Sequence, residues 1–184
     1  MDNSGIETKT PYGALLEMER RCLEVGAELP NIEVLKALWT GIGFRIGDLK
    51  MISPLGQIQE VLSNPEMTLV PGAKDWVRGV TNNRGNLIPI IDLANYLEMG
   101  KVSNTRRNRV LVIRFGLLNS GLLVDEVKGQ RHFEYEQEVP IEQQMLYGKL
   151  NEFVESAFSR EGDIWMLFNM RRLVEAPAFL HAAQ

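Results

Sequence analysis

The sequence predicts an all-β fold of small barrels or a sandwich, with a helical extension at its N-terminus. From Trp39 onward, apolar and polar residues alternate in short runs that are typical of half-buried strands. Turn residues separate these runs at close intervals, as they do in small barrels. The runs are not followed by helical patterns of roughly 10–15 residues, which argues against a doubly wound parallel sheet.

The composition is that of an ordinary soluble domain. Of the 184 residues, 45% are apolar and 24% are charged, and the net charge of -4 gives no general attraction to nucleic acid or anionic lipid. Cys22 is the single cysteine, which agrees with a reducing cytoplasm. The longest apolar runs, such as 87–93, are too short to span a bilayer, and the N-terminus lacks a secretory signal pattern. We therefore expect a cytoplasmic protein of one domain or two small lobes.

The first 38 residues predict a helical extension. Thr10 and Pro11 suit the N-cap and the first position of a helix that ends at Pro30. A short second helix is expected from Ile32 to about Leu38. Apolar residues of the first helix recur at spacings of three and four, which places them on one face: Leu15, Met18, Cys22, Val25 and Leu29. We interpret this extension as a docking element for the chain's own barrels or for a partner.

The next part of the chain predicts two hairpins and a strand between them. The predicted strands are 42–46, 49–52, 57–62, 77–83 and 86–93. Gly47-Asp48 supplies the turn of the first hairpin and Arg84-Gly85 that of the second. Apolar residues in 93–99 suit one short helix, and the polar, basic stretch 100–108 is the best candidate for a loop between two lobes.

The second half repeats the strand pattern. The predicted strands are 110–115, 121–127, 153–159 and 163–168. Turns are expected at 118–120 and 160–162, and a closing helix at 170–175. The resulting organisation is a helical extension at 1–38, a β domain at 39–175 and a C-terminal tail at 176–184.

The most informative segment is the hairpin 77–93. Gly85 can adopt the positive φ that a tight turn often requires, and Pro89 must face an edge or a bulge because it cannot donate to a ladder. Asp92 stands where the strand ends and a helix begins, a suitable capping position. From the residues alone, this is a hairpin with a charged tip, and such tips are usually solvated.

The same segment resembles the CheW family, whose signature reads roughly G-V-x-N-L-R-G-x-x-x-P-V-x-D-L. The residues that match in order and spacing are Gly79, Val80, Asn82, Arg84, Gly85, Pro89, Asp92 and Leu93. Segment 58–62 resembles the family's V-x-E-I strand, Val70-Pro71 its proline step, and 121–127 its G-L-L-V-D-x-V strand. The resemblance covers about residues 39–175, and several ordered blocks are more specific than one short motif.

Within this family, the chain looks most like the PilI-type proteins of chemosensory systems that control type IV pili and twitching motility. One departure is Asn83, where the family usually has an aliphatic residue. Along an extended strand Asn83 points away from Asn82 and Arg84, so we expect the departure to affect local packing more than the face that carries Arg84.

The resemblance implies a fold of two five-stranded SH3-like barrels and a function as a non-catalytic adaptor without cofactor or metal. Its implied partners are the regulatory domain of a CheA-type histidine kinase and the cytoplasmic tip of a methyl-accepting chemoreceptor, which would recruit it to membrane receptor arrays. The expected partner-binding residues are Arg84, Glu60, Ile58, Val80, Asn82, Gly85 and Leu87. The alternative for Arg84 is an internal role, stacked on its own lobe or paired with a carboxylate such as Glu60.

An enzyme has little support in the residues. Cys22 lies on an apolar helical stripe, where a packed thiol is the ordinary reading. His132 and His181 read as surface or edge residues without metal-ligand spacing. The carboxylates of 125–126 and 134–136 read as solvated strand faces, and no nucleotide-binding glycine pattern occurs.

The second function considered is nucleic-acid binding by a small barrel. Its cations would be Lys101, Arg106, Arg107 and Arg109. A single-strand groove also needs aromatic residues among the cations, and this stretch has none. We therefore expect a solvated loop here.

Overall fold

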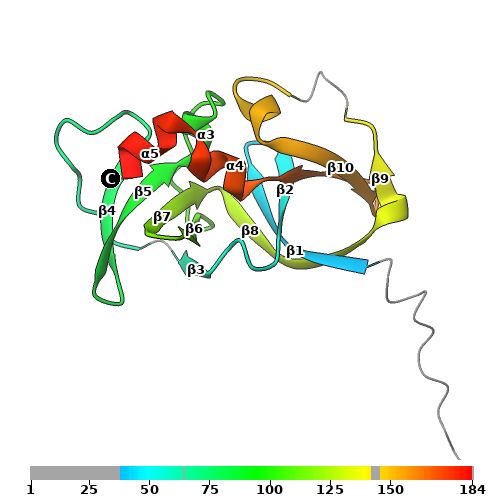
Figure 1. Cartoon of the computed structure of the whole chain (residues 1–184), viewed down its shortest axis with the longest axis horizontal. Coiled ribbons are helices and arrows are strands. Elements are labelled where there is room, and N and C mark those ends of the chain that lie inside the picture. Colours follow the sequence, from blue (N-terminus) through cyan, green and yellow to red (C-terminus); the bar gives the residue numbers. More distant parts are fainter. Residues whose placement is uncertain (1–37, 64, 142–145, 184) are drawn as a thin grey trace, which may run out of the picture. The chain divides into compact units, whose positions relative to one another are not determined.

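The computed structural model describes residues 38–63, 65–141 and 146–183 (Figure 1). The predicted helices of the N-terminal extension lie outside these residues. Within them the chain is mostly β and forms two curled sheets, which confirms the predicted fold class.

The first sheet has six strands in the order β8-β1-β2-β11-β10-β9 within the described residues. Its neighbours pair antiparallel, except β2 and β11, which are parallel. It exceeds the expected five strands because of β9, which has two residues. The bounds are β1 (Leu38–Ile46), β2 (Leu49–Pro54), β8 (Glu126–Glu134), β9 (Glu138–Val139), β10 (Val154–Arg160) and β11 (Asp163–Phe168).

The second sheet has five strands in the order β3-β6-β7-β5-β4, also counted over the described residues. Here β5 and β7 are the parallel pair, so each sheet joins two antiparallel groups through one parallel contact. The bounds are β3 (Glu60–Ser63), β4 (Val77–Asn83), β5 (Asn86–Asp92), β6 (Arg109–Phe115) and β7 (Leu118–Val124).

Short helices connect and cover the sheets. The structure describes α3 (Leu93–Tyr96), η2 (Tyr135–Gln137), η4 (Leu150–Glu152), α4 (Met170–Glu175) and α5 (Pro177–Ala183). The closing helix predicted at 170–175 is α4, and its N-cap Asn169 accepts a hydrogen bond from the Arg172 N–H. The segment predicted as a tail is largely α5, whose fully buried Phe179 packs against Tyr96 with ring centroids 5.6 Å apart.

One hydrophobic core spans both sheets. It includes Phe44 and Met51 of the first sheet together with Ile90 and Leu111 of the second, all fully buried. A smaller cluster in the first sheet consists of Ile52, Phe133, Phe158 and Trp165, with Trp39 packed against it. Burial of this much apolar surface is the main term that holds small barrels together.

Two predicted connections are wrong. The turn expected at 118–120 lies at Gly116 and Leu117, because Gly116 has a φ of 61° and β7 already begins at Leu118. The strand expected at 121–127 breaks at Asp125, whose N–H donates to the Arg45 carbonyl at 3.1 Å. There the chain passes from the second sheet to the first, since β7 and β8 belong to different sheets.

The stretch 100–108 is therefore not the connection between the sheets. It joins α3 to β6, and β5 and β6 both belong to the second sheet. Its conformation is held by the Asn108 side chain, which donates to the Ser103 carbonyl and accepts from the Thr105 N–H.

Candidate functional site

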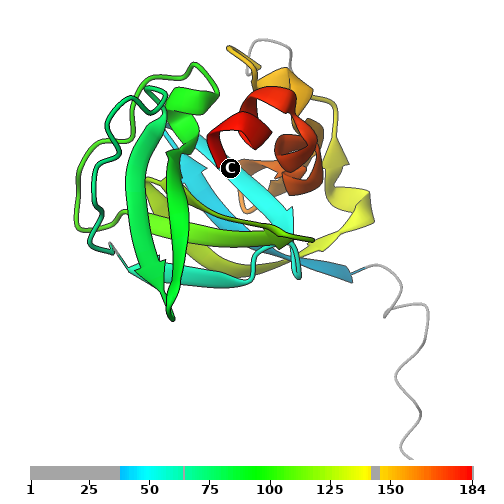
Figure 2. The same cartoon turned by 60° about the vertical axis from the view of Figure 1, so that its left-hand side comes forward.

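The candidate site is the tip of the β4–β5 hairpin, which extends beyond the rest of its sheet (Figures 1 and 2). In the register Asn83 pairs with Asn86, so the turn consists of Arg84 and Gly85 as predicted. Their φ angles are 53° and 87°. Positive φ at both central residues defines a type I′ turn, whose twist matches that of the flanking strands.

Arg84 is an unusual residue for this turn. Position one of a type I′ turn favours asparagine, aspartate or glycine, because a left-handed conformation costs most other residues roughly 1 kcal/mol or more. The Arg84 side chain is nevertheless 78% exposed, so no burial in the fold offsets this cost. Backbone strain at an exposed, charged position points to a function of the side chain.

Arg84 forms an ion pair with Glu60. Its Nη2 lies 2.7 Å from the Glu60 Oε1, and the Glu60 side chain is 27% exposed. The alternative foreseen for Arg84, a pair with its own lobe, is thus present in the structure. Glu60 begins β3, one edge of the second sheet, whereas β4 is the opposite edge, so the pair joins the two edges of the curled sheet.

Asn83 contributes a second contact to the same carboxylate. Its Nδ2 lies 3.4 Å from the Glu60 Oε2. The expectation that Asn83 points away from Arg84 is wrong, because strand alternation ends where Arg84 enters the left-handed region. The Glu60 carboxylate therefore accepts hydrogen bonds from Asn83 at the end of β4 and from Arg84 in the turn.

The other predicted residues of the hairpin have distinct environments. The Asn82 Oδ1 accepts a hydrogen bond from the Gly85 N–H at 2.8 Å and so closes the turn. Leu87, which pairs with Asn82 in the register, is 73% exposed. Val80 is half-buried, and its N–H and carbonyl pair with Thr68 at 2.8 and 2.9 Å.

Ile58 does not belong to this surface. Its side chain is 9% exposed and lies in the main core, ahead of the strand that begins at Glu60. The neighbouring exposed apolar residues are Val61 and Leu69, which the sequence analysis did not select. The sequence 58–63 does not alternate between apolar and polar residues and so carries no signal for Val61. The position of Leu69 depends on the bridge between Thr68 and β4.

Asp92 anchors the base of the hairpin. Its carboxylate accepts the N–H of Asn95 at 3.0 Å, as expected of an N-cap, and the N–H of Val102 at 3.2 Å. Arg78 Nε lies 3.9 Å from its Oδ2. Burial raises the pKa of Asp92, and the two backbone hydrogen bonds and Arg78 act in the opposite direction.

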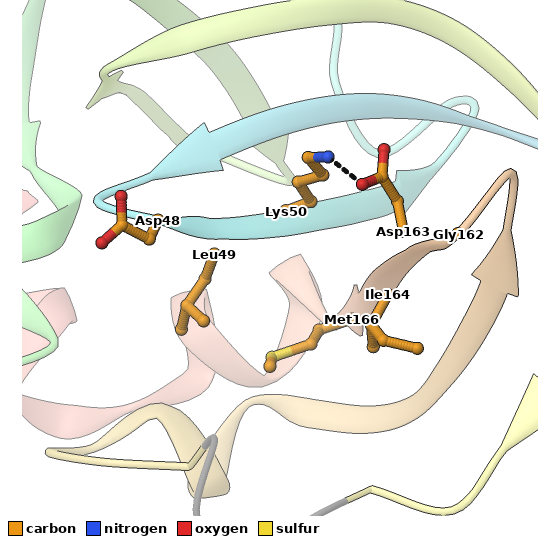
Figure 3. Close-up of a pocket in the computed structure, with 7 residues that line it drawn as sticks. All are labelled: Asp48, Leu49, Lys50, Gly162, Asp163, Ile164 and Met166. Carbon is orange, nitrogen blue, oxygen red and sulfur yellow. Dashed lines mark ion pairs between the residues drawn. The ribbon is translucent and has the colours of Figure 1, made fainter.

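A cavity of about 200 Å³ lies between the β1–β2 turn and β11 (Figure 3). Lys50 and Asp163 point toward each other there and form an ion pair. The remaining lining residues shown are Asp48, Leu49, Gly162, Ile164 and Met166. In the described ranges, no cluster of three His, Cys, Asp or Glu residues could hold a metal ion. The Lys50 and Asp163 side chains are both partly exposed, so this pair lies at the mouth of the cavity and not in a sealed site.

The basic stretch 100–108 gives the nucleic-acid hypothesis no support. Arg109 Nη1 donates to the carbonyls of Arg106 and Asn108, which holds that nitrogen against its own loop. His132 is likewise engaged locally, with Nδ1 2.9 Å from the Thr40 Oγ1. Among the described helices, none has the length and apolar character needed to cross a membrane.

Comparison with known proteins identifies relatives of this chain. The sequence profile of the CheW-like domain matches residues 40–178. Protein PilI of Pseudomonas aeruginosa is 36% identical over 180 residues, which cover 96% of this chain and 98% of PilI. Protein FrzA of Myxococcus xanthus is 34% identical over 88 residues, covering 48% of this chain and 55% of FrzA.

A solved structure has the same fold. The crystal structure of the scaffolding protein TtCheW from Thermoanaerobacter tengcongensis superposes with a TM-score of 0.65 over 76% of this chain and 94% of TtCheW. Sequence identity in this comparison is 20%, so the likeness concerns the fold.

Proposed function

The chain belongs to the CheW-like domain family and is a scaffold adaptor of chemosensory signalling. We propose that it couples a methyl-accepting chemoreceptor to a CheA-type histidine kinase, and that this coupling controls twitching motility by type IV pili. The likeness to PilI over nearly the full length of both chains supports the assignment to pilus control. The protein acts without catalysis or cofactor, in the cytoplasm, and reaches membrane receptor arrays through its partners.

The observation that carries the proposed contact is the strained, exposed Arg84. A turn needs no guanidinium at this position, and the left-handed backbone makes arginine a costly choice there. A planar guanidinium has five N–H donors, so the pair with Glu60 leaves donors directed at solvent. These donors suit a carboxylate of a partner, which a guanidinium binds through two parallel hydrogen bonds.

Exposed apolar side chains lie on the segments that are connected to this charged anchor. Val61 follows Glu60 on β3, and Leu87 lies opposite Asn82 on the hairpin. Leu69 follows Thr68, which pairs with β4. Protein interfaces commonly place a few anchors among apolar contacts that exclude water. We propose that Arg84, Glu60, Asn82, Gly85, Val80 and Leu87 form the partner-binding surface together with Val61 and Leu69.

Signal transfer by this adaptor requires no chemistry in the chain. A receptor that the adaptor holds against the kinase shifts the populations of the active and inactive kinase states. The size of this shift is set by the difference between the receptor–adaptor complex's affinities for the two states. A hairpin closed by a type I′ turn and an ion pair is already ordered, so binding carries little ordering cost.

The experiment is a pull-down with the full chain as bait, followed by titration calorimetry against the receptor tip and the kinase regulatory domain. We expect the wild-type chain to capture both partners and Arg84→Ala to lower the affinity for one of them. Arg114→Ala is the matched control, because Arg114 is an exposed arginine on β6 of the same sheet. Capture of nucleic acid with absorbance at 260 nm that is lost at high salt would instead favour the nucleic-acid function.

A further inference from the structure

Glu60 is held by two donors of different kinds. The Arg84 guanidinium donates to one carboxylate oxygen at 2.7 Å and the Asn83 amide donates to the other at 3.4 Å. Asn83 is half-buried beside the turn, whereas Arg84 is largely exposed. An exposed ion pair alone restrains a flexible glutamate weakly. The second donor, at a longer distance, restrains the carboxylate further.

We propose that Asn83 is a specificity-determining residue that acts through Glu60: it fixes the Glu60 carboxylate, which in turn orients the Arg84 guanidinium toward an acidic side chain of the partner. The inference rests on the proposed function, since it concerns how the same hairpin tip selects its partner. Asn83 is a positioning residue, and Arg84 is the group that touches the partner.

The physical effect is a lower ordering cost on binding. Immobilising one rotamer-rich side chain at an interface changes affinity by roughly 2- to 10-fold. With Glu60 restrained by Asn83, the plane of the Arg84 guanidinium keeps one orientation, and its solvent-facing donors suit a carboxylate. A partner that offers a hydroxyl or a cation gains less, so the triad of Glu60, Asn83 and Arg84 favours an acidic partner surface.

The same hairpin provides a matched control. Asn86 lies opposite Asn83 in the register and is exposed, so Asn86→Ala removes the same amide from the facing strand. Asn83→Asp removes the donor with little change in volume and places a second negative charge beside Glu60. We expect both Asn83 variants to fold as wild type.

The test is titration calorimetry of the full chain against the receptor cytoplasmic fragment and the kinase regulatory domain. We expect Asn83→Ala and Asn83→Asp to lower the affinity by about 3- to 10-fold, for the same partner whose affinity Arg84→Ala lowers. Asn86→Ala should change affinity less than about 2-fold, and melting should stay within about 2 °C for all three. In a Glu60→Ala background, Asn83→Ala should have no further effect, because its action requires the carboxylate.

Three results would overturn the inference and can be told apart. If Arg84→Ala weakens binding while Asn83→Ala binds like wild type, the proposed function stands and the positioning role of Asn83 is wrong. An equal loss from Asn83→Ala with and without Glu60 also removes that role, since Asn83 would then act directly. If the wild-type chain binds neither partner, the proposed function fails, and the inference fails with it.

Discussion

Replacing Arg84 by asparagine should stabilise the fold slightly while lowering the affinity for the partner. Arginine at a φ of 53° carries a backbone cost of roughly 1 kcal/mol, and asparagine adopts this conformation more readily. The lost pair with Glu60 is mostly exposed on the Arg84 side and contributes about 0–1 kcal/mol. The net change for Arg84→Asn is therefore between about 0 and +1 kcal/mol in the free energy of unfolding.

Arg84→Ala provides the comparison. Alanine keeps the strained backbone and loses the ion pair, so it should lower the free energy of unfolding by about 0.5 kcal/mol. Both variants remove the guanidinium and should weaken binding about 30-fold, which corresponds to an anchor of roughly 2 kcal/mol. Arg84→Lys should recover part of the affinity, because an ammonium lacks the planar fork.

Urea unfolding followed by tryptophan fluorescence measures the stabilities, and calorimetry measures the affinities. The predicted order of stability is asparagine at or above arginine, with alanine lowest, at an unchanged dependence on urea. The reasoning is refuted if Arg84→Asn is less stable than Arg84→Ala, since backbone strain would then not be present. Wild-type affinity for both partners in either variant would remove Arg84 from the binding surface.

Three further predictions concern the fold around the site. Gly79→Ala should lower the free energy of unfolding, measured in urea, by more than about 2 kcal/mol. A Cβ at this φ of 141° would clash with the Thr68 carbonyl oxygen. The control Gly100→Ala, where a Cβ meets open space, should cost about 1 kcal/mol. Ile58→Ala should cost about 2–5 kcal/mol as a core deletion, while Leu87→Ala should change stability by less than about 0.5 kcal/mol; similar costs for the two would contradict their assignment to core and surface. Because burial raises the pKa of Asp92 in the folded state, the folded protein binds more protons than the unfolded chain just above about pH 4. The contribution of Asp92 to stability therefore falls as pH rises through that range. Measured over a pH series, the free energy of unfolding should fall less in Asp92→Asn, and an identical slope would argue against the raised pKa.

The β4–β5 hairpin was predictable because its signals are local. Alternating residues defined both strands to within one position, and Arg84-Gly85 marked the turn. Asp92 was likewise recognised as a cap from its position at the end of the strand. A turn and a cap each depend on a few adjacent residues, so their geometry can be inferred without knowing which strands pair.

The features that were missed depend on contacts between distant segments. The run 121–127 was predicted as one strand although Asp125 and Glu126 interrupt its apolar residues, because only the pairing of its two ends with different sheets shows the break. Ile58 and Glu60 are two residues apart, so they would share a face on one continuous strand. The strand β3 begins only at Glu60, and Ile58 lies in the shared core. The contact of Asn83 with Glu60 was not predicted, because it joins opposite edges of a curled sheet and only closure of the sheet brings the two residues together. The pair of Arg84 with Glu60 was foreseen only as an alternative.

The central claim is that this chain links a receptor to a kinase in one complex. Analytical ultracentrifugation of the receptor cytoplasmic fragment and the CheA-type kinase, with and without the full chain, tests it directly. The account predicts a ternary species that forms only when the chain is present and that is reduced for Arg84→Ala at the same concentrations. A chain that sediments alone, or that binds one partner without bringing in the other, would contradict the account.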